Sequence, residues 1–236
     1  RQRQMCIRDR SSIEPVFSGD PEPIKAANCV EFKGNDNLFL LPGHIQFSSY
    51  DTTYNIAETM TGSLNLMKNV PGALRRMLEL TAEKYSLDII LIDMSPSISA
   101  TNANILMQSD YFIVPCAPDY FCYMAIESLV SIFPKWCETY KKIALNEIFQ
   151  SATYKMKDKP PVFLGTIQQR YRPRNGSPAR AFADWIADIN NLVADKLIPI
   201  LTANDMFCES GDKGSYEEPY NLINIADFNS LIAQSQ

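Results

Sequence analysis

The sequence predicts an α/β protein with a mostly parallel sheet and helices on both faces. Two observations support this class: short apolar runs alternate with segments of helical periodicity, and the run at 87–93 is almost continuously apolar. Strands of parallel sheets carry such runs because both of their faces are buried. The chain has 236 residues, of which 46% are hydrophobic and 21% charged, so it is long enough to bury a substantial core.

Three elements are predicted in the first half of the chain. The run NLFLL at 37–41 has the composition of a strand and is closed by a Pro-Gly pair. Between residues 71 and 85 the apolar side chains recur on one helical face, and Pro71 suits the first turn of a helix. LDIILID at 87–93 is predicted to be a buried strand that ends in Asp93.

The alternation continues through the second half. The predicted elements are a helix at 102–108, a strand at 111–115, a helix at 121–133 with Phe121, Met124, Ala125, Leu129 and Ile132 inward, and a strand at 161–169. The last helix is predicted to start with Ser177 as its cap and Pro178 in its first turn. Its apolar side chains at helical spacing are Phe182, Trp185, Ile186, Ile189 and Val193.

Composition disfavours several classes of protein. The six cysteines form no CxxC pair and the only histidine is His44, so we expect buried thiols and neither a zinc site nor a disulfide framework. No apolar run approaches the length of about 18 residues that a spanning helix needs, and the N-terminus lacks the apolar core of a secretory signal. The sequence therefore predicts a cytoplasmic protein without a stable membrane span.

Charge is distributed unevenly along the chain. The net charge of −5 argues against bulk coating of nucleic acid. Between residues 155 and 180, however, there are seven lysines and arginines and a single acid, Asp158. This tract is a candidate basic patch, with Arg172, Arg174 and Arg180 as candidate DNA contacts. Ordinary solvated charge, or a role of these arginines near a nucleotide, is the alternative.

Asp93 is the first candidate for chemistry. A strand that ends in aspartate places a carboxylate at the edge where open parallel sheets bind ligands. In phosphate-binding sheets such an acid holds a magnesium ion, usually through water, because this metal keeps much of its hydration shell. An apolar run ending in aspartate, taken alone, more often marks a helix cap or a turn residue.

The residues that follow carry the most specific pattern. Residues 91–121, LIDMSPSISATNANILMQSDYFIVPCAPDYF, resemble the second half of ParA/MinD-type partition ATPases, which are deviant Walker A P-loop NTPases. The family pattern is an apolar strand, D-x-P-P-S, a helix with an asparagine and a leucine, an aspartate, and a strand ending in I-P or V-P before a further proline. The residues at the family's spacing are Asp93, Pro96, Ser97, Asn104, Leu106, Asp110, Val114, Pro115 and Pro118.

This resemblance implies an incomplete P-loop NTPase-like fold and a site for ATP and Mg²⁺. It implies that Asp93 is the catalytic carboxylate on the magnesium side and that Pro115 lies at the nucleotide. It also implies that Ser95, Pro96 and Ser97 form a switch loop. Ser95 stands where the family usually has the first proline of its pair. Serine leaves this turn less rigid, so we expect the switch behaviour to differ.

The similarity extends to both sides. NLFLLPG resembles the family's N-L-x-L-I-P-G and the tail LINIADFNSLIAQSQ resembles a closing segment, so the resemblance covers about residues 13–236. FLGTIQQRY at 163–171 resembles the strand G-v-v-l-N-R-y, whose asparagine reads the adenine edge in MinD-like members. Gln169 takes this place and Arg170 follows, so both are candidate nucleotide-binding residues. Glutamine keeps an amide donor and acceptor but is one methylene longer, and an ordinary polar strand end is the alternative.

The family's glycine-rich loop, K-G-G-x-G-K-T/S, does not occur in the sequence. Backbone N–H groups and lysines of such a loop hold the phosphates. We expect this loop to precede residue 11 in the intact protein, and we expect residues 11–236 to be a partial ATPase domain. Residues 1–10, RQRQMCIRDR, are interpreted as a non-native leader. The intact protein is expected to be an ATPase, and the chain as given is expected to be inactive alone.

Three functions remain open on the sequence. The first is a plasmid or chromosome partition ATPase that forms an ATP-dependent homodimer, binds DNA non-specifically and responds to a ParB-like centromere-binding protein. The second is a MinD-like placement ATPase that cycles on a membrane through a C-terminal amphipathic helix. The third is a non-catalytic interaction module that retains the fold. An upstream K-G-G-x-G-K-T frame would favour an enzyme, and a neighbouring gene for a ParB-like protein would favour partition.

Overall fold

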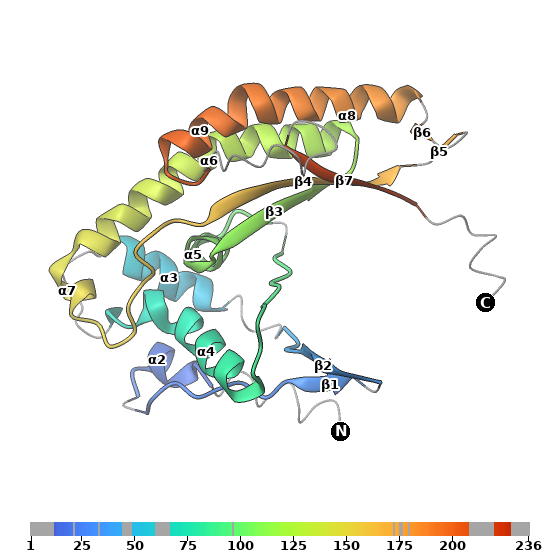
Figure 1. Cartoon of the computed structure of the whole chain (residues 1–236). Helices are drawn as coiled ribbons and strands as arrows, with labels where there is room; N and C mark the ends of the chain where they lie inside the picture. The colour runs from blue at the N-terminus through green and yellow to red at the C-terminus, as the bar shows by residue number, and fades with distance from the viewer. Residues whose placement is uncertain are drawn as a thin grey trace. The chain divides into compact units, whose positions relative to one another are not determined.

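The computed structural model describes residues 12–20, 22–32, 34–43, 49–59, 67–95, 97–171, 173–174, 177–178, 180–207 and 220–227. The chain divides into two compact units. The first unit contains residues 1–109 and 139–158, and the second contains residues 110–138 and 159–236. The long helix α6 (Tyr120–Leu145) begins in the second unit and ends in the first. Figure 1 shows the elements of both units.

The first unit is mainly helical. Its helices are α2 (Glu14–Ser18), α3 (Tyr50–Thr59), α4 (Val70–Tyr85), α5 (Ala100–Gln108) and α7 (Glu147–Gln150), together with the end of α6. The predicted helices at 71–85 and 102–108 are confirmed as α4 and α5. Proline stands in the first turn of α4, where its missing N–H costs no helical hydrogen bond. The helix stops at Ser86, which has a left-handed φ of 53°.

Aromatic side chains from α2 and α3 form the centre of the first unit's core. The ring of Phe17 stacks on Tyr50 at a centroid distance of 3.9 Å and meets the edge of Tyr54 at 5.4 Å. Tyr54 is almost fully buried, and burial raises the pKa of its hydroxyl far above the ordinary value. Apolar residues of α4 pack into the same cluster, including Ala73, which is fully buried. This cluster holds the helices of the first unit together.

The predicted strand at 37–41 forms within a hairpin of the first unit. β1 (Val30–Phe32) and β2 (Asn35–Leu40) pair in an antiparallel way, and Gly34 between them has a φ of 92°. A turn with this φ is readily adopted by glycine because it has no Cβ. The strand character of the run is therefore confirmed, and its partner is the short strand just before it.

Residues 87–93 were predicted to form a buried strand, and this prediction is wrong. The segment makes no strand pairing, and Ile89 and Leu91 are 77% and 90% exposed. A strand forms where a neighbouring strand exchanges backbone hydrogen bonds with it, and none of the residues described here pairs with this segment. The apolar run therefore indicates suitability for a sheet, whereas the strand itself requires a partner.

The second unit contains the parallel sheet. β3 (Tyr111–Cys116), β4 (Val162–Tyr171) and β7 (Asn221–Ala226) lie in the order β3-β4-β7, and both pairs are parallel. The predicted strands at 111–115 and 161–169 are confirmed as β3 and β4. Parallel strands need crossover connections, and the helices of this unit supply them. The predicted α/β class with a parallel sheet is confirmed.

Helices cover one face of this sheet within the second unit. α8 (Arg180–Leu192), the π-helix η3 (Val193–Leu197), α9 (Ile198–Ala203) and the first part of α6 lie on the same side of the strands (Figure 1). Phe112 of β3 contacts Phe133 of α6 and Phe163 of β4, with ring centroids 5.5 and 5.2 Å apart. In the described part of the chain, no helix combines the length and apolar character needed to cross a membrane.

Two details of the predicted helices are wrong. Ser177 and Pro178 form the short strand β6, paired with β5 (Pro173–Arg174), so α8 begins at Arg180 and not after a Ser177 cap. In α6, Phe121 and Met124 are exposed, whereas Ile126 is 1% exposed. The helix continues through Pro134 to Leu145, and a burial stripe over this longer helix follows a different face from one fitted to residues 121–133.

Candidate functional site

Asp93 lies in the first unit, in the irregular segment between α4 and α5. Its side chain is exposed, and the absence of strand pairing at 87–93 means that it does not end a strand as predicted. Ser95 and Ser97 follow, and Pro96 between them lies outside the described residues. The Ser97 N–H donates to the Ser95 carbonyl oxygen at 2.8 Å, and the two hydroxyl oxygens are 3.0 Å apart. The predicted switch loop is thus a tight, hydrogen-bonded turn.

Asn102 holds this turn, a role that its place in the sequence does not reveal. The Asn102 Nδ2 donates to the carbonyl oxygens of Ser95 at 2.7 Å and Ser97 at 2.6 Å. It also lies 3.3 and 3.1 Å from their hydroxyl oxygens. The only signal in the sequence was an asparagine close after a serine-rich loop, which is compatible with many local hydrogen bonds.

The first turns of α5 are fixed by a cap residue and by contacts with two other helices. Ser99 caps α5, because its hydroxyl accepts the Asn102 N–H at 3.2 Å. Asp51 of α3 accepts from the Thr101 N–H at 2.9 Å and from the Thr101 hydroxyl at 3.1 Å. Asn104 donates from its Nδ2 to the Pro71 carbonyl oxygen of α4 at 3.0 Å. The element that carries Asn102 is therefore anchored to α3 and α4.

The second group of predicted residues lies at the carboxyl ends of the parallel strands in the second unit. Pro115 is the fifth residue of β3 and pairs with Ile167 of β4. Gln169 is half-buried, and the exposed Arg170 has a positive φ of 62° at a bulge of β4. A left-handed φ in a non-glycine residue costs about 1 kcal/mol or more. The structure therefore brings Pro115, Gln169 and Arg170 to one edge of one sheet.

Of the candidate DNA contacts, one has a described side chain. Arg180 is exposed at the first position of α8. Arg174 belongs to the short strand β5, and Arg172 lies outside the described residues.

Two free cysteines lie near the same sheet edge, the buried Cys116 and the half-buried Cys122. Burial, with smaller contributions from Cys122 and Asp119, raises the pKa of Cys116 to about 12. Burial also raises the pKa of Cys122, whose Sγ accepts the Ala117 N–H at 3.2 Å. Asp119 caps α6 by accepting the Cys122 N–H at 2.8 Å. Raised thiol pKa values disfavour the thiolate, so these cysteines are poor nucleophiles.

Gln168, the neighbour of Gln169, is fully buried, so its amide is not exposed for contact with a nucleotide. Its Nε2 lies 3.4 Å from the Asn190 Oδ1 of α8, a long hydrogen bond. Its Oε1 has no hydrogen-bond partner among the described residues. Alternation along β4 places Gln168 and Gln169 on opposite faces of the strand, and Gln168 faces α8.

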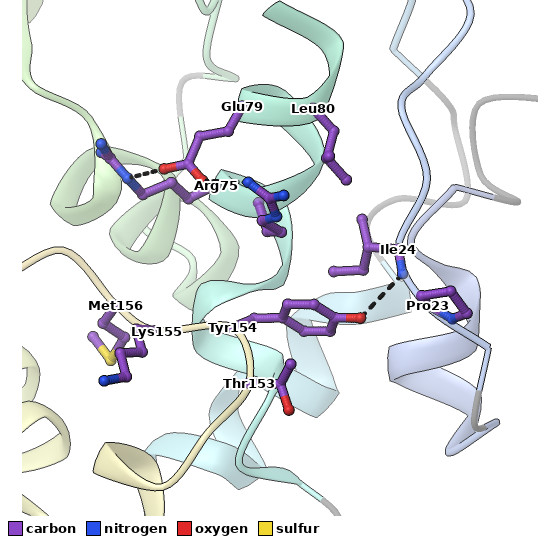
Figure 2. Close-up of a pocket in the computed structure, with 10 residues that line it drawn as sticks. Pro23, Ile24, Arg75, Glu79, Leu80, Thr153, Tyr154, Lys155 and Met156 are labelled. Atoms are coloured by element: carbon purple, nitrogen blue, oxygen red, sulfur yellow. Dashed lines mark hydrogen bonds and ion pairs between the residues drawn. The ribbon is translucent and has the colours of Figure 1, made fainter. Parts of the chain in front are cut away.

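A separate groove of about 750 Å³ opens on the first unit. Its lining residues are Pro23, Ile24, Arg75, Arg76, Glu79, Leu80, Thr153, Tyr154, Lys155 and Met156 (Figure 2). Figure 2 shows the Tyr154 side chain reaching toward the backbone of Ile24, and the Tyr154 hydroxyl oxygen accepts the Ile24 N–H at 3.1 Å. None of the predicted site residues lines this groove.

Tyr154→Phe is expected to destabilise the chain by about 1 to 2 kcal/mol, because it leaves the N–H of the buried Ile24 without its acceptor. Equilibrium urea unfolding measures the change. Tyr120→Phe is the matched control, since Tyr120 is 55% exposed, and its effect should stay within about 0.5 kcal/mol. Equal stability of the two variants would show that the Tyr154 hydroxyl does not hold the 23–24 segment.

The comparisons with known proteins place the chain in a family. A family model described as an AAA domain matches residues 10–146, which is more than half of the chain. The chain belongs to this AAA domain family, a family of ParA/MinD-like P-loop NTPases. The match includes the Asp93 segment, the turn at Ser95 and Ser97, and Asn102.

Two individual proteins are similar to this chain. An uncharacterized protein, MJECL24 from Methanocaldococcus jannaschii, is 32% identical over 98 residues, which are 42% of this chain and 33% of that protein. This chain therefore spans about a third of that relative. The crystal structure of protein DIP2308 from Corynebacterium diphtheriae matches with a TM-score of 0.59 and 18% identity, covering 84% of this chain and 74% of that one. At 18% identity, the similarity to the structure of DIP2308 shows a shared fold alone.

P-loop NTPase-like AAA domains generally bind nucleotide and Mg²⁺, and the residues present fit the metal better than the phosphates. Asp93 offers an exposed carboxylate beside a polar turn, which suits a hydrated magnesium ion that takes few protein ligands. The described residues contain no group of three or more His, Cys, Asp or Glu side chains that could hold a metal unaided. A K-G-G-x-G-K-T/S phosphate loop does not occur in these 236 residues.

Proposed function

We propose that this chain is part of a ParA-type partition ATPase, a cytoplasmic homodimer that binds DNA non-specifically when loaded with ATP and responds to a ParB-like protein. The observation that carries the proposal is the placement of an exposed Asp93 just before a hydrogen-bonded turn, within the residues matched by the family. Nucleotide switches work through segments whose order depends on contacts with the γ-phosphate and Mg²⁺, and in this proposal the turn after Asp93 is such a segment.

In this proposal Asp93 holds the magnesium shell by accepting hydrogen bonds from its water ligands. Magnesium, when bound, neutralises charge on the phosphates as the γ-phosphoryl group is transferred. Ser95 and Ser97 follow Asp93 closely in the chain, and in the proposal their hydroxyl groups orient water near that carboxylate. The chain therefore contributes positioning and charge, which are the main requirements of phosphoryl transfer.

At the sheet edge of the second unit, Gln169 supplies an amide that can both donate to and accept from an adenine base. Its half-buried side chain is accessible enough for such a contact. Arg170 follows with its side chain exposed, and Pro115 lies one residue before the end of the neighbouring strand β3. In the proposal these three residues border the nucleotide, while Arg172, Arg174 and Arg180 contact DNA phosphates.

The chain of 236 residues is expected to bind ATP only weakly, with a Kd on the order of 1 mM or higher, because the K-G-G-x-G-K-T/S loop that holds phosphates does not occur in its sequence. Isothermal titration with ATP and Mg²⁺ measures this, and ADP without metal is the control. Tight, magnesium-dependent binding would show that other residues of this chain hold the phosphates.

The DNA part of the proposal needs a chain that also carries the phosphate loop ahead of residue 11. Fluorescence anisotropy with a random-sequence duplex, in ATP and in ADP, is the measurement. We expect ATP-dependent binding that weakens steeply with salt, as phosphate contacts do. Equal binding in both nucleotides, or binding to anionic vesicles in place of DNA, would contradict the partition role.

A further inference from the structure

The turn after Asp93 has an unusual source of order. Its two carbonyl groups, those of Ser95 and Ser97, point to the same side-chain amide, at 2.7 and 2.6 Å from the Asn102 Nδ2. An amide NH₂ group has two protons, so these two short contacts use both. The hydroxyl oxygens of Ser95 and Ser97 lie farther from the Asn102 Nδ2, at 3.3 and 3.1 Å, so these contacts are weaker than those to the carbonyl oxygens. A single side chain therefore ties both ends of the turn.

The position of Asn102 is fixed by contacts other than those with the turn. The residue is 5% exposed in the first turn of α5, and its own N–H is bound by the Ser99 hydroxyl. Thr101 beside it is bound to Asp51 of α3, and Asn104 is bound to the Pro71 carbonyl of α4. Little conformational freedom remains to be lost when the amide binds the turn.

The turn itself lacks other support among the described residues. Ser95 and Ser97 are exposed, and so is Ile98 at 68%. The hydrogen bonds of the turn run between its own serines or to Asn102. If the two hydrogen bonds from the Asn102 amide break, water can solvate the carbonyl groups of Ser95 and Ser97. The turn can then open without unfolding α5.

We propose that Asn102 is a positioning residue, a latch that holds the turn after Asp93 in one conformation. The latch takes over the stiffening that a proline at position 95 would give, since Ser95 alone leaves the backbone more freedom. Its meaning for a magnesium site rests on the proposed function. The latch itself is a property of this chain and can be measured without nucleotide.

The test is ¹⁵N relaxation on the 236-residue chain, with Asn102→Leu and Asn102→Asp beside wild type. Both variants keep the size of the side chain and remove its two donors. Order parameters of the Ser95 and Ser97 amides are expected to fall from about 0.85 to below about 0.6, while Ala103 to Met107 of α5 stay rigid. The cap of α5 is Ser99 and not Asn102, so the aspartate variant keeps a polar side chain of similar shape at the third position of the helix and removes the two donors while the cap remains.

Two further variants sharpen the result. Ser99→Ala removes the cap on the Asn102 N–H and leaves the side-chain amide, so the turn should stay ordered. Adding Ser95→Pro to Asn102→Leu should restore the order of the Ser97 amide. The proline ring fixes the backbone angle φ at position 95 and so restricts the turn in place of the lost hydrogen bonds. The described part of the chain shows no hydrogen bond from the Ser95 N–H that proline would remove.

A turn that stays rigid in folded Asn102→Asp would overturn the latch. Loss of order throughout α5 in both donor-lacking variants would also overturn it, because Asn102 would then serve the helix and not the turn. These readouts need no ATP turnover. A failed latch leaves the ATPase proposal standing, and a failed ATPase proposal leaves the latch.

Discussion

Asp93→Asn is expected to lower ATP turnover on the order of 100-fold in a chain that carries a K-G-G-x-G-K-T/S loop ahead of residue 11. Asparagine keeps the size of the side chain and one acceptor oxygen but removes the negative charge. A magnesium shell depends on that charge, whereas a turn cap does not, because aspartate and asparagine cap about equally well. Steady-state hydrolysis at saturating ATP measures the effect, and circular dichroism reports folding.

Asp88→Asn is the matched control for this experiment. Asp88 is exposed in the same segment and undergoes the same change of charge, so its turnover should remain within about twofold of wild type. A folded Asp93→Asn protein with near-normal turnover would remove Asp93 from the site. Equal losses in both variants would point to the charge of the whole segment and not to one carboxylate.

Gly72→Ala is expected to destabilise the first unit by about 3 kcal/mol. In an ordinary helix this change stabilises, since alanine is favoured over glycine by about 1 kcal/mol. Here α4 lies directly against the segment 153–156. A Cβ at position 72 would overlap the Tyr154 carbonyl group and lie 2.8 Å from the Lys155 carbonyl oxygen. These are backbone atoms, so they cannot rotate away as a side chain would.

Urea unfolding followed by circular dichroism measures this loss. Gly19→Ala is the control, because Gly19 has a φ of 79° and open space around it. That variant should lose only the cost of a left-handed backbone, about 1 to 2 kcal/mol. Gly72→Ala with wild-type stability would mean that residues 153–156 can move off α4 at no cost.

Local pattern was sufficient for most elements of this fold. α4 runs from Val70 to Tyr85 against a prediction of 71–85, because proline and a one-sided apolar face mark a helix through neighbours in sequence alone. β3 and β4 were recognisable for a similar reason, as apolar runs of strand length. α8 was placed too early because Ser177 and Pro178 are used by a short strand pair, which their identities as cap and first-turn residues do not reveal.

Contacts between distant segments could not be predicted from local sequence pattern. The run at 87–93 has every local property of a buried strand, yet pairing depends on a partner strand that no local pattern specifies. Asn102 looks like any asparagine in a first helical turn. Its hold on Ser95 and Ser97 arises because α3 and α4 fix the angle at which α5 meets the turn. Family, element type and the candidate carboxylate follow from residue order, whereas exposure, pairing and the latch follow from packing, since hydrogen bonds between segments depend on where the chain brings them together.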